Sequence, residues 1–424
     1  MESWLARAAR MHGERAAVVA PEETLSYAEL SARARSVAGA LRERGIGPGD
    51  RVALALPSVA LVPALHGCLL LGAVAVPIDL RLRPDERAAR QSGTRLVLES
   101  PVTGEQVDDA YDAAPSDIAT LMFTSGTTAG PKPVELSYDN WLWNALGSAL
   151  ALGLDPEERW LCPMPLAHVG GLSIQLRSAI YATTVVLHER FDADRALAAL
   201  MDADARVTLV SLVPTMLARL LDAGLREPPT LRRVLLGGGP IAGALLERAA
   251  AAGVPVSPSF GMTETCSQVA TDGFALLGSE LRIADDGELL VRGRAVAGGA
   301  LSGDGWLHTG DLGRLDGSGR LTIVGRKSDT IVSGGENVAP AEVEAALLEH
   351  PAVADAAVLG RADPEWGEAV VAQIVVREGA TAGAEDLRAH CAARLAPFKV
   401  PKRFEVVAQV PRGVTGKLLR RELL

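Results

Sequence analysis

A loop rich in small hydroxyl residues and glycine is the segment of this sequence best suited to chemistry. It reads Thr124-Ser125-Gly126-Thr127-Thr128-Ala129-Gly130-Pro131-Lys132 and follows an apolar, strand-like run at residues 118–123. Backbone N–H groups and hydroxyls of such a loop can bind phosphate oxygens, and Lys132 adds positive charge. The spacing differs from the P-loop, because Pro131 stands where that pattern has its second glycine. A solvated turn is the alternative, but four hydroxyls within five residues favour phosphate binding.

A second candidate is the run RRVLLGGGP at residues 232–240. Here a predicted strand ends in Gly237, Gly238 and Gly239, and Pro240 occupies a plausible first helical position. A flat ligand could lie against the bare backbone of these glycines. The spacing also resembles a dinucleotide fingerprint, which would indicate an NAD oxidoreductase. That fingerprint requires an acidic residue about 20 positions further on, and residues 253–260 contain none, so the dinucleotide interpretation is disfavoured.

An aromatic ring, a hydroxyl and a carboxylate occur close together in the segment Ser259-Phe260-Gly261-Met262-Thr263-Glu264. Phe260 could stack on a purine, Thr263 could bind a phosphate, and Glu264 could hold Mg²⁺ beside substrate phosphates. The same residues would equally suit a helix N-terminus, with Thr263 as the cap and Phe260 in the core. Both interpretations stay open for this segment alone.

Two further segments add single charged residues. In Trp306–Asp311, Asp311 could accept hydrogen bonds from both hydroxyls of a ribose or simply close a turn. His308 has no partner at metal-ligand spacing, so we interpret it as a turn or packing residue. Near the end of the chain, Lys417 follows a glycine turn. It could neutralise charge that develops as a carboxylate attacks a phosphate, although a solvated lysine is the ordinary meaning of such a residue.

Length and composition exclude several classes of protein. The 424 residues, 48% hydrophobic and 22% charged, suffice for two or three folded domains, which excludes global disorder and a small isolated binding module. The net charge of −10 provides no basic surface for a nucleic acid, so DNA and RNA are not expected as partners. The four cysteines lie far apart, with no CxxC pair and no clustered histidines, which predicts a reduced, intracellular protein.

One long run, residues 52–78, has no Asp, Glu, Lys or Arg and exceeds the length that spans a membrane. Interruptions at Pro57, Pro63, Gly67, Gly72 and Pro77 instead favour a buried unit of strand, helix and strand. The first 20 residues include several charges and no uncharged apolar core of a signal peptide. We therefore expect no membrane span and a cytoplasmic location.

The pattern of the whole chain predicts an α/β fold. Up to about residue 252, helical stretches alternate with short apolar runs, which is typical of parallel sheets covered by helices. After residue 279, segments punctuated by Gly and Asp predict β-hairpins. From about residue 329, a helix over 340–349, strands over 353–359 and 369–376, and a helix over 384–395 follow. We predict a large domain over residues 1–327, of mostly parallel sheets with a small β-rich subdomain, and a small α+β domain over residues 328–424.

Together and in this order, these segments resemble the adenylate-forming enzymes, which include acyl-CoA synthetases, luciferases and the adenylation domains of peptide synthetases. The resemblance covers nearly the whole chain. It implies that the loop 124–132 binds the phosphates of ATP and that Gly237–Pro240 and Phe260, between Ser259 and Gly261, form the adenine wall. It implies that Thr263 contacts phosphate, that Glu264 contacts Mg²⁺, and that Asp311 binds the ribose.

The resemblance also assigns roles around the predicted domain boundary. Arg326 would contact the nucleotide, and Ser328 would be the pivot of a mobile C-terminal domain. Lys417 would be the adenylation lysine, and the loop with Gly334 and Gly335 would turn inward for the thiol step. The phosphate loop departs from the family pattern, because Ala129 and Pro133 replace two glycines, which makes a stiffer loop.

Residues 163–172 (PMPLAHVGGL), 177–181 and 184–191 (TVVLHERF) are similar to the o-succinylbenzoate CoA ligases of menaquinone biosynthesis, and residues 333–342 (SGGENVAPAE) fit them too. This resemblance implies an acyl pocket that includes His168 and Gly170. A core histidine is the alternative, but the Pro and Gly flanks argue against a helix interior. We expect Arg177, or a nearby cation, to pair with the second, non-reacting carboxylate of the substrate, because a buried anion requires a partner.

The implied reaction is ATP-dependent ligation of an acid to CoA through an acyl adenylate, with ATP, Mg²⁺, CoA and a small carboxylic acid as ligands. Three alternatives remain open: a fatty or aryl acyl-CoA synthetase, an adenylation enzyme that loads a carrier protein, and a non-catalytic nucleotide-binding protein. The sequence is also compatible with a homodimer.

Overall fold

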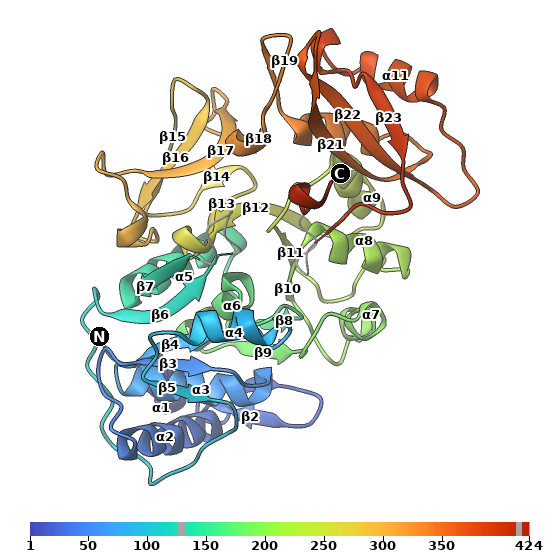
Figure 1. The fold of residues 1–424 in the computed structure, drawn as a ribbon. Coiled ribbons are helices and arrows are strands. Elements are labelled where there is room, and N and C mark those ends of the chain that lie inside the picture. The colour runs from blue at the N-terminus through green and yellow to red at the C-terminus, as the bar shows by residue number, and fades with distance from the viewer. Residues whose placement is uncertain (125–131, 413–417, 424) are drawn as a thin grey trace.

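Two helix-covered sheets make up most of the chain before residue 276 (Figure 1). The structure is a computed structural model that describes residues 1–124, 132–412 and 418–423. The larger sheet has a parallel centre with antiparallel strands at both edges. Its strands, in order across the sheet, are β14 (Phe274–Ala275), β13 (Ser267–Thr271), β12 (Val256–Met262), β11 (Arg233–Leu236), β10 (Leu209–Leu212), β8 (Arg159–Cys162), β9 (Thr184–Leu187), β1 (Ala16–Val19) and β2 (Thr24–Ser26).

The second sheet is parallel except for its last strand. Its order is β5 (Leu96–Leu98), β3 (Arg51–Leu54), β4 (Val74–Pro77), β6 (Ile118–Phe123) and β7 (Pro133–Ser137). The helices of this part of the chain are α1 (Trp4–His12), α2 (Tyr27–Glu43), α3 (Ser58–Leu70), α4 (Pro84–Gln91), α5 (Tyr138–Leu152), α6 (Val169–Tyr181), α7 (Ala193–Met201), α8 (Pro214–Asp222) and α9 (Gly243–Ala251). The predicted helix-covered, mostly parallel sheets are therefore confirmed.

The uncharged run at residues 52–78 folds as the predicted buried unit of strand, helix and strand. It forms β3, α3 and β4, and the two strands pair in parallel. Pro63 and Gly67 do not interrupt the helix as expected but lie inside α3, where Gly67 lets the helix pack closely against Val37 of α2. Among the described residues, every helix falls short of the length or apolarity that a membrane crossing requires.

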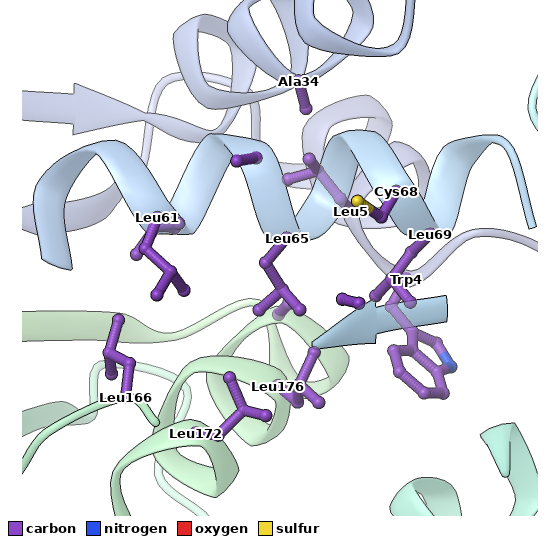
Figure 2. Close-up of a cluster of buried hydrophobic side chains, with 14 of the residues drawn as sticks. Trp4, Leu5, Ala34, Leu61, Leu65, Cys68, Leu69, Leu166, Leu172 and Leu176 are labelled. Carbon is purple, nitrogen blue, oxygen red and sulfur yellow. The ribbon is translucent and has the colours of Figure 1, made fainter. Parts of the chain in front are cut away.

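The main hydrophobic core lies where helices from both sheets meet. Leu61, Leu65 and Leu69 follow one another at four-residue spacing along α3 and face leucines of α6 and of the segment before it (Figure 2). These side chains are buried in one cluster with residues of α1 and α2. Because α6 begins at the end of the loop that contains His168, this core fixes the position of that loop.

The remaining strands form two smaller sheets. The first is antiparallel and consists of β15 (Ser279–Ile283), β16 (Glu288–Gly293), β17 (Leu307–Leu315) and β18 (Leu321–Arg326), as the hairpin pattern predicts. The C-terminal sheet contains β20 (Glu336–Val338), β19 (Ile331–Ser333), β22 (Gly367–Val376), β21 (Val353–Asp363) and β23 (Arg403–Val406). Helices α10 (Pro340–Leu348) and α11 (Ala384–Ala392) pack on that sheet, close to their predicted ranges (Figure 1).

The core predicts a clear difference between two leucines. Leu65→Ala should lower the free energy of unfolding by about 2–5 kcal/mol, because Leu65 is 0% exposed and its loss leaves a cavity. Leu150→Ala, on the exposed side of α5, is the matched control and should change it by less than about 0.5 kcal/mol, because Leu150 is 70% exposed. Denaturant unfolding measures both; equal effects would contradict the assignment of this core.

Candidate active site

The carboxyl ends of three adjacent parallel strands meet at one edge of the larger sheet. Strands β10, β11 and β12 pair in parallel, so the residues that follow β11 lie beside the middle of β12. A Cβ on Gly237 would lie 2.5 Å from Oγ of Ser259, and Gly238 has φ 79°, so both positions require glycine. The structure thus brings together the predicted glycine run and the segment around Phe260. Crevices at this edge are where open α/β sheets bind ligands.

Pro240 does not start a helix as the sequence suggested. Helix α9 begins at Gly243, and the chain from Gly237 to Ala242 forms a longer connection first. Gly239 belongs to this connection and lies near Pro214 at the start of α8. The extra length follows from the consecutive glycines, which have little preference for continuing directly into a helix.

Thr263 and Glu264 begin the short helix η1 (Thr263–Thr265), directly after β12. Both side chains are partly exposed, and the backbone is fixed by a 2.8 Å hydrogen bond from Ala297 N–H to the Glu264 carbonyl. Phe260 packs at the edge of the core of the small antiparallel sheet, while Gly261 lies against Ser267 and Gln268. The alternative that Thr263 caps an α-helix is wrong, because the turn ends at Cys266 in the left-handed conformation.

The hydroxyl-rich loop joins two antiparallel strands. Thr124 and Lys132 lie at its two ends, where the Thr124 N–H donates to the Lys132 carbonyl at 3.1 Å between β6 and β7. Strand β7 packs against η1, so the ends of the loop lie near the Thr263–Glu264 segment. Ser125, Gly126, Thr127 and Thr128 lie outside the described residues.

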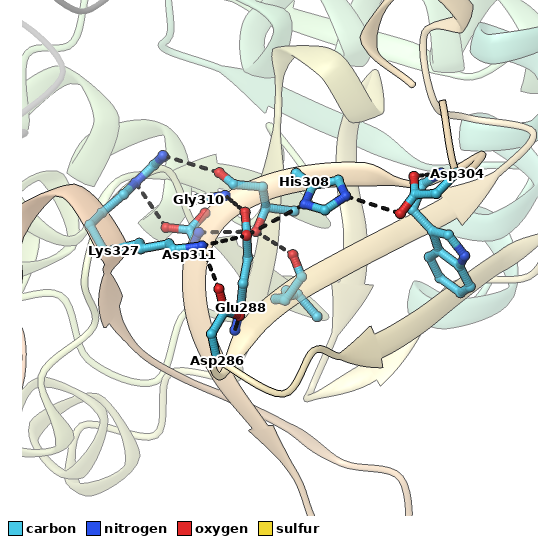
Figure 3. Close-up of polar contacts among 11 residues, drawn as sticks. Asp286, Glu288, Asp304, His308, Gly310, Asp311 and Lys327 are labelled. Atoms are coloured by element: carbon cyan, nitrogen blue, oxygen red, sulfur yellow. Dashed lines mark hydrogen bonds and ion pairs between the residues drawn. The ribbon is translucent and has the colours of Figure 1, made fainter. Parts of the chain in front are cut away.

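Asp311 lies in strand β17 and forms an ion pair with Arg326, its partner in β18, at 2.8 Å (Figure 3). Asp311 is 5% exposed, and its N–H donates to Oγ1 of Thr309. Arg326 also donates to the Thr309 carbonyl at 3.3 Å. Asp311 therefore does not close a turn, and the structure brings together two residues that the resemblance assigns to the nucleotide.

A network of charged residues binds the chain next to Asp311 and Arg326. Glu288 accepts hydrogen bonds from the Gly310 N–H at 2.8 Å and from Lys327 at 3.1 Å, and Lys327 also pairs with Asp286 (Figure 3). Burial would raise the pKa of Glu288, but the bonds from Gly310 and Lys327 lower it below its ordinary value. The ionised carboxylate thus fixes Gly310, whose φ of 70° places Asp311.

His308 is part of the same network, not the turn or packing residue that the sequence suggested. Its Nε2 lies 3.1 Å from Asp304 and its Nδ1 lies 3.5 Å from Glu288 (Figure 3). The Asp304 carboxylate raises the pKa of His308 above its ordinary value. Sequence spacing missed this role because Glu288 belongs to another strand.

His168 occupies the N-cap position of α6 without a capping hydrogen bond from its side chain, which confirms that it lies outside a helix interior. Its side chain is 35% exposed, and Nε2 lies 3.3 Å from a buried carboxylate, Asp79. Gly170 lies in the first turn of α6, against Met164. No spacing indicated Asp79, which comes 89 positions earlier and follows strand β4 of the other sheet.

Arg177 lies in α6 and is 1% exposed. Its Nε and Nη2 donate to Oδ1 of Asn144, and the guanidinium lies 5.6 Å from the ring of Trp160. Within the described residues Nη1 has no hydrogen-bond partner and no carboxylate lies within ion-pair distance. Burial lowers the pKa of Arg177. A buried cation of this kind has unused capacity for an anion.

Gly334 and Gly335 form the two-residue turn of the hairpin between β19 and β20. Their φ angles of 61° and 83° are those of the tight turns that favour glycine, and the Gly334 N–H donates to the Trp366 carbonyl at 2.8 Å. Lys417 lies outside the described residues. Arg412 and Leu418, the described residues on either side of positions 413–417, pair in an antiparallel β-bridge. Arg412 also donates to Asp355 of β21, so both residues lie beside the C-terminal sheet.

Comparisons with known proteins agree with this arrangement. A family model described as AMP-binding enzyme matches residues 5–110 and 91–301, and one described as AMP-binding enzyme C-terminal domain matches residues 342–417. The chain therefore belongs to the AMP-binding enzyme family.

Within that family the chain is similar to enzymes from Bacillus subtilis. It is 39% identical to the 2-succinylbenzoate–CoA ligase of strain 168, over 99% of this chain and 97% of the relative. The solved o-succinylbenzoate CoA synthetase from B. subtilis with its acyl-adenylate intermediate has a TM-score of 0.91 and 37% identity, covering 100% and 98% of the two chains. The same enzyme with ATP and magnesium ion has a TM-score of 0.90 and 37% identity, covering 100% and 99%.

The charged network predicts a titration. Asp304→Asn should lower the pKa of His308, because it removes the carboxylate that stabilises the imidazolium. In the unmodified protein this stabilisation is complete at acidic pH and is lost as the pH rises through the raised pKa. NMR titration of the His308 ring measures the shift, with Asp316→Asn as control because Asp316 bonds Ser318 instead. An unchanged pKa in Asp304→Asn would contradict the network.

Proposed function

We propose that this protein is an ATP-dependent acid–CoA ligase that converts o-succinylbenzoate into its CoA thioester through an acyl adenylate. The observation that carries the proposal is the full-length similarity in sequence and fold to o-succinylbenzoate CoA synthetases, combined with the Asp311–Arg326 pair and the glycine-lined sheet edge. The alternative function is a fatty or aryl acyl-CoA synthetase. Such an enzyme would differ only in its acid-binding pocket and would share every other feature.

Different residues are proposed to bind the adenine, the ribose and the phosphates of the nucleotide. Gly237, Gly238, Gly239 and Pro240 would border the adenine together with Ser259, Phe260 and Gly261. Asp311 would accept hydrogen bonds from the ribose hydroxyls, and Arg326, already paired with it, would contact the nucleotide. Thr263 and the loop from Thr124 to Lys132 would bind the phosphates, since hydroxyls and N–H groups suit phosphate oxygens.

The residues around Glu264 suit a magnesium ion. Its carboxylate is partly exposed and has no hydrogen bond or ion pair with another described side chain. The described part of the chain also contains no group of three or more acidic, His or Cys side chains placed to hold a metal. A single carboxylate matches Mg²⁺, which is usually bound by one or two carboxylates plus substrate phosphates. When bound, Mg²⁺ would neutralise negative charge on those phosphates.

The reaction would take place in two balanced steps. An oxygen of the substrate carboxylate attacks the α-phosphorus of ATP, the bond to the bridging oxygen breaks, and pyrophosphate leaves with the electron pair. The sulfur of CoA, having lost its proton to solvent, then attacks the acyl carbon, and AMP leaves. Lys417 would stabilise the charge of the first step, and the Gly334–Gly335 turn would border the thiol in the second. His168, Gly170 and Arg177 would hold the acid.

We propose that the two domains are residues 1–327 and 328–424, with Ser328 as the pivot. The ion pairs support this boundary. Lys327 binds Asp286 and Glu288 of the small antiparallel sheet, whereas Asp329 binds Arg420, which also pairs with Glu344 of the C-terminal domain. Ser328 is the one residue between these opposite attachments, so rotation there would break neither set. Rotation of this kind typically takes microseconds to milliseconds.

Three finer points belong to the same proposal: free CoA as the acceptor, a cytoplasmic location and a homodimer. The alternative of a carrier-protein acceptor differs in that acylated protein, and not acyl-CoA, would accumulate. Light scattering of the purified protein tests the homodimer.

Product analysis tests the function. The protein incubated with ATP, Mg²⁺, CoA and o-succinylbenzoate should yield the CoA thioester by mass, with one AMP and one pyrophosphate per thioester. In a panel of fatty and aryl acids, o-succinylbenzoate should give the highest kcat/KM. A better fatty or aryl substrate would overturn the substrate assignment, and ATP binding without pyrophosphate release would overturn the enzyme assignment.

Lys417→Ala should lower adenylate formation by about 100-fold or more while ATP still binds, because the lysine is assigned to charge that develops in the transition state. Pyrophosphate release measures the first effect and ATP titration the second. Arg403→Ala, which removes an exposed cation from β23 of the same domain, is the matched control and should leave both unchanged. Normal pyrophosphate release by Lys417→Ala would contradict the role of this lysine.

Arg177→Ala should raise the KM for o-succinylbenzoate about 10-fold or more, because a charge-assisted hydrogen bond is lost. The KM for ATP should stay the same, as should the weaker KM for an analogue that lacks the second carboxylate. Arg177→Lys keeps the charge but not the paired donors and should lie between the two. Equal losses for both acids would show that Arg177 supports only the fold.

A further inference from the structure

A buried carboxylate lies next to His168 and is held there by an arginine. Asp79 follows β4 and is 8% exposed. Arg81 donates to it three times, from the backbone N–H at 3.0 Å, from Nε at 2.8 Å and from Nη2 at 2.6 Å. Burial would raise the pKa of Asp79, but the hydrogen bonds from Arg81 and His168 hold it well below its ordinary value. Asp79 is therefore an anion at neutral pH, and its Oδ2 lies 3.3 Å from Nε2 of His168.

These contacts determine which ring nitrogen of His168 holds the proton. Nε2 lies 3.3 Å from the Asp79 carboxylate and 3.4 Å from Nη2 of Arg81. If Nε2 were the unprotonated nitrogen, its lone pair would face the negative oxygen. A proton on Nε2 instead donates to that oxygen in a charge-assisted hydrogen bond. The Nε2–H form is therefore favoured, and Nδ1 is left for a ligand.

The backbone of His168 is fixed as well. Its N–H donates to the Pro165 carbonyl at 3.1 Å, and its carbonyl accepts from Leu172 in the first turn of α6. Because the start of α6 holds the backbone, only rotation of the side chain can move the ring, and the contact with Asp79 restricts that rotation. A group that must meet a substrate within a few tenths of an ångström needs this kind of support.

We propose that Asp79, held by Arg81, is a positioning residue for His168: it keeps the proton on Nε2 and turns Nδ1 toward the acid-binding region. The inference rests on the proposed function only for what Nδ1 meets. The ring state itself is a property of the resting protein and can be measured without substrate.

Nitrogen-15 NMR of the histidine rings tests the ring state, with the His168 signals assigned from their loss in His168→Ala. In the unmodified protein the shifts should report Nε2–H. Asp79→Ala leaves Arg81 free to donate to Nε2, so the proton should move to Nδ1. Asp79→Asn should keep Nε2–H, because its amide oxygen can accept the same hydrogen bond. An Nδ1–H ring in the unmodified protein, or an unchanged ring in Asp79→Ala, would overturn the proposal.

Kinetics test the consequence for catalysis. Asp79→Ala should lower kcat for adenylation of o-succinylbenzoate about 10- to 100-fold, since misplacement of a positioned group costs that much, with the KM for ATP unchanged. Asp79→Asn should restore most of the rate. In the His168→Ala background, Asp79→Ala should have less than about a 2-fold further effect, because the two residues act as one unit. Effects that multiply in the double variant would show that Asp79 acts independently of His168.

Glu158→Gln is the matched control. Glu158 is likewise a buried carboxylate, 2% exposed and paired with an arginine, Arg232, but it lies at the opposite end of β8 from His168. This variant should lower thermal stability to an extent similar to Asp79→Ala while the His168 ring and the kcat for adenylation stay unchanged. An equal loss of kcat would show that any broken buried pair gives the effect. A protein that forms no adenylate at all would overturn the proposed function and leave the ring measurement decisive for Asp79.

Discussion

The ion pair between Asp311 and Arg326 is the interaction on which the arrangement of the site depends. It joins β17 and β18 at the point where the chain leaves the small antiparallel sheet for the C-terminal domain. One residue further on, Lys327 binds Asp286 and Glu288, so the last residues before the pivot are held by three carboxylates. The same bonds that orient the carboxylate proposed to bind the ribose thus also hold the residues on one side of the proposed pivot.

The other residues of the proposed site come from distant parts of the sequence, because parallel strands end at the same edge of a sheet. Gly237, which follows β11, lies directly against Ser259 of the adjacent strand β12, although the two are 22 positions apart in the sequence. His168 comes from the loop after β8, and Asp79 follows β4 in the other sheet. Side chains of α3 and α6 pack against each other in one buried cluster, so the hydrophobic core fixes the two sheets relative to each other and with them the residues proposed to hold the acid (Figure 2).

Much of this was predictable where one segment contains its own signal. The uncharged run at residues 52–78 predicted β3, α3 and β4, and the segments rich in Gly and Asp after residue 279 predicted the hairpins of the small antiparallel sheet. Features that depend on distant partners were not predictable: the contacts of His308 with Glu288 and of Asp79 with His168 join residues of different elements, and no spacing indicates them. The prediction that a helix starts at Pro240 was wrong, because the three glycines before it lengthen the connection and α9 begins only at Gly243. The roles of Ser125–Thr128 and Lys417 stay predictions, since those residues lie outside the described part of the chain.

The most direct measurement is a crystal structure of the protein with a non-hydrolysable sulfamoyl analogue of o-succinylbenzoyl adenylate. We expect ribose hydroxyls within hydrogen-bond distance of Asp311, the purine along Gly237–Gly239 beside Phe260, and the acyl group reaching His168. A ligand that binds on another surface, with Asp311 bonded only to protein groups, would contradict the claim that these strand ends form one nucleotide site.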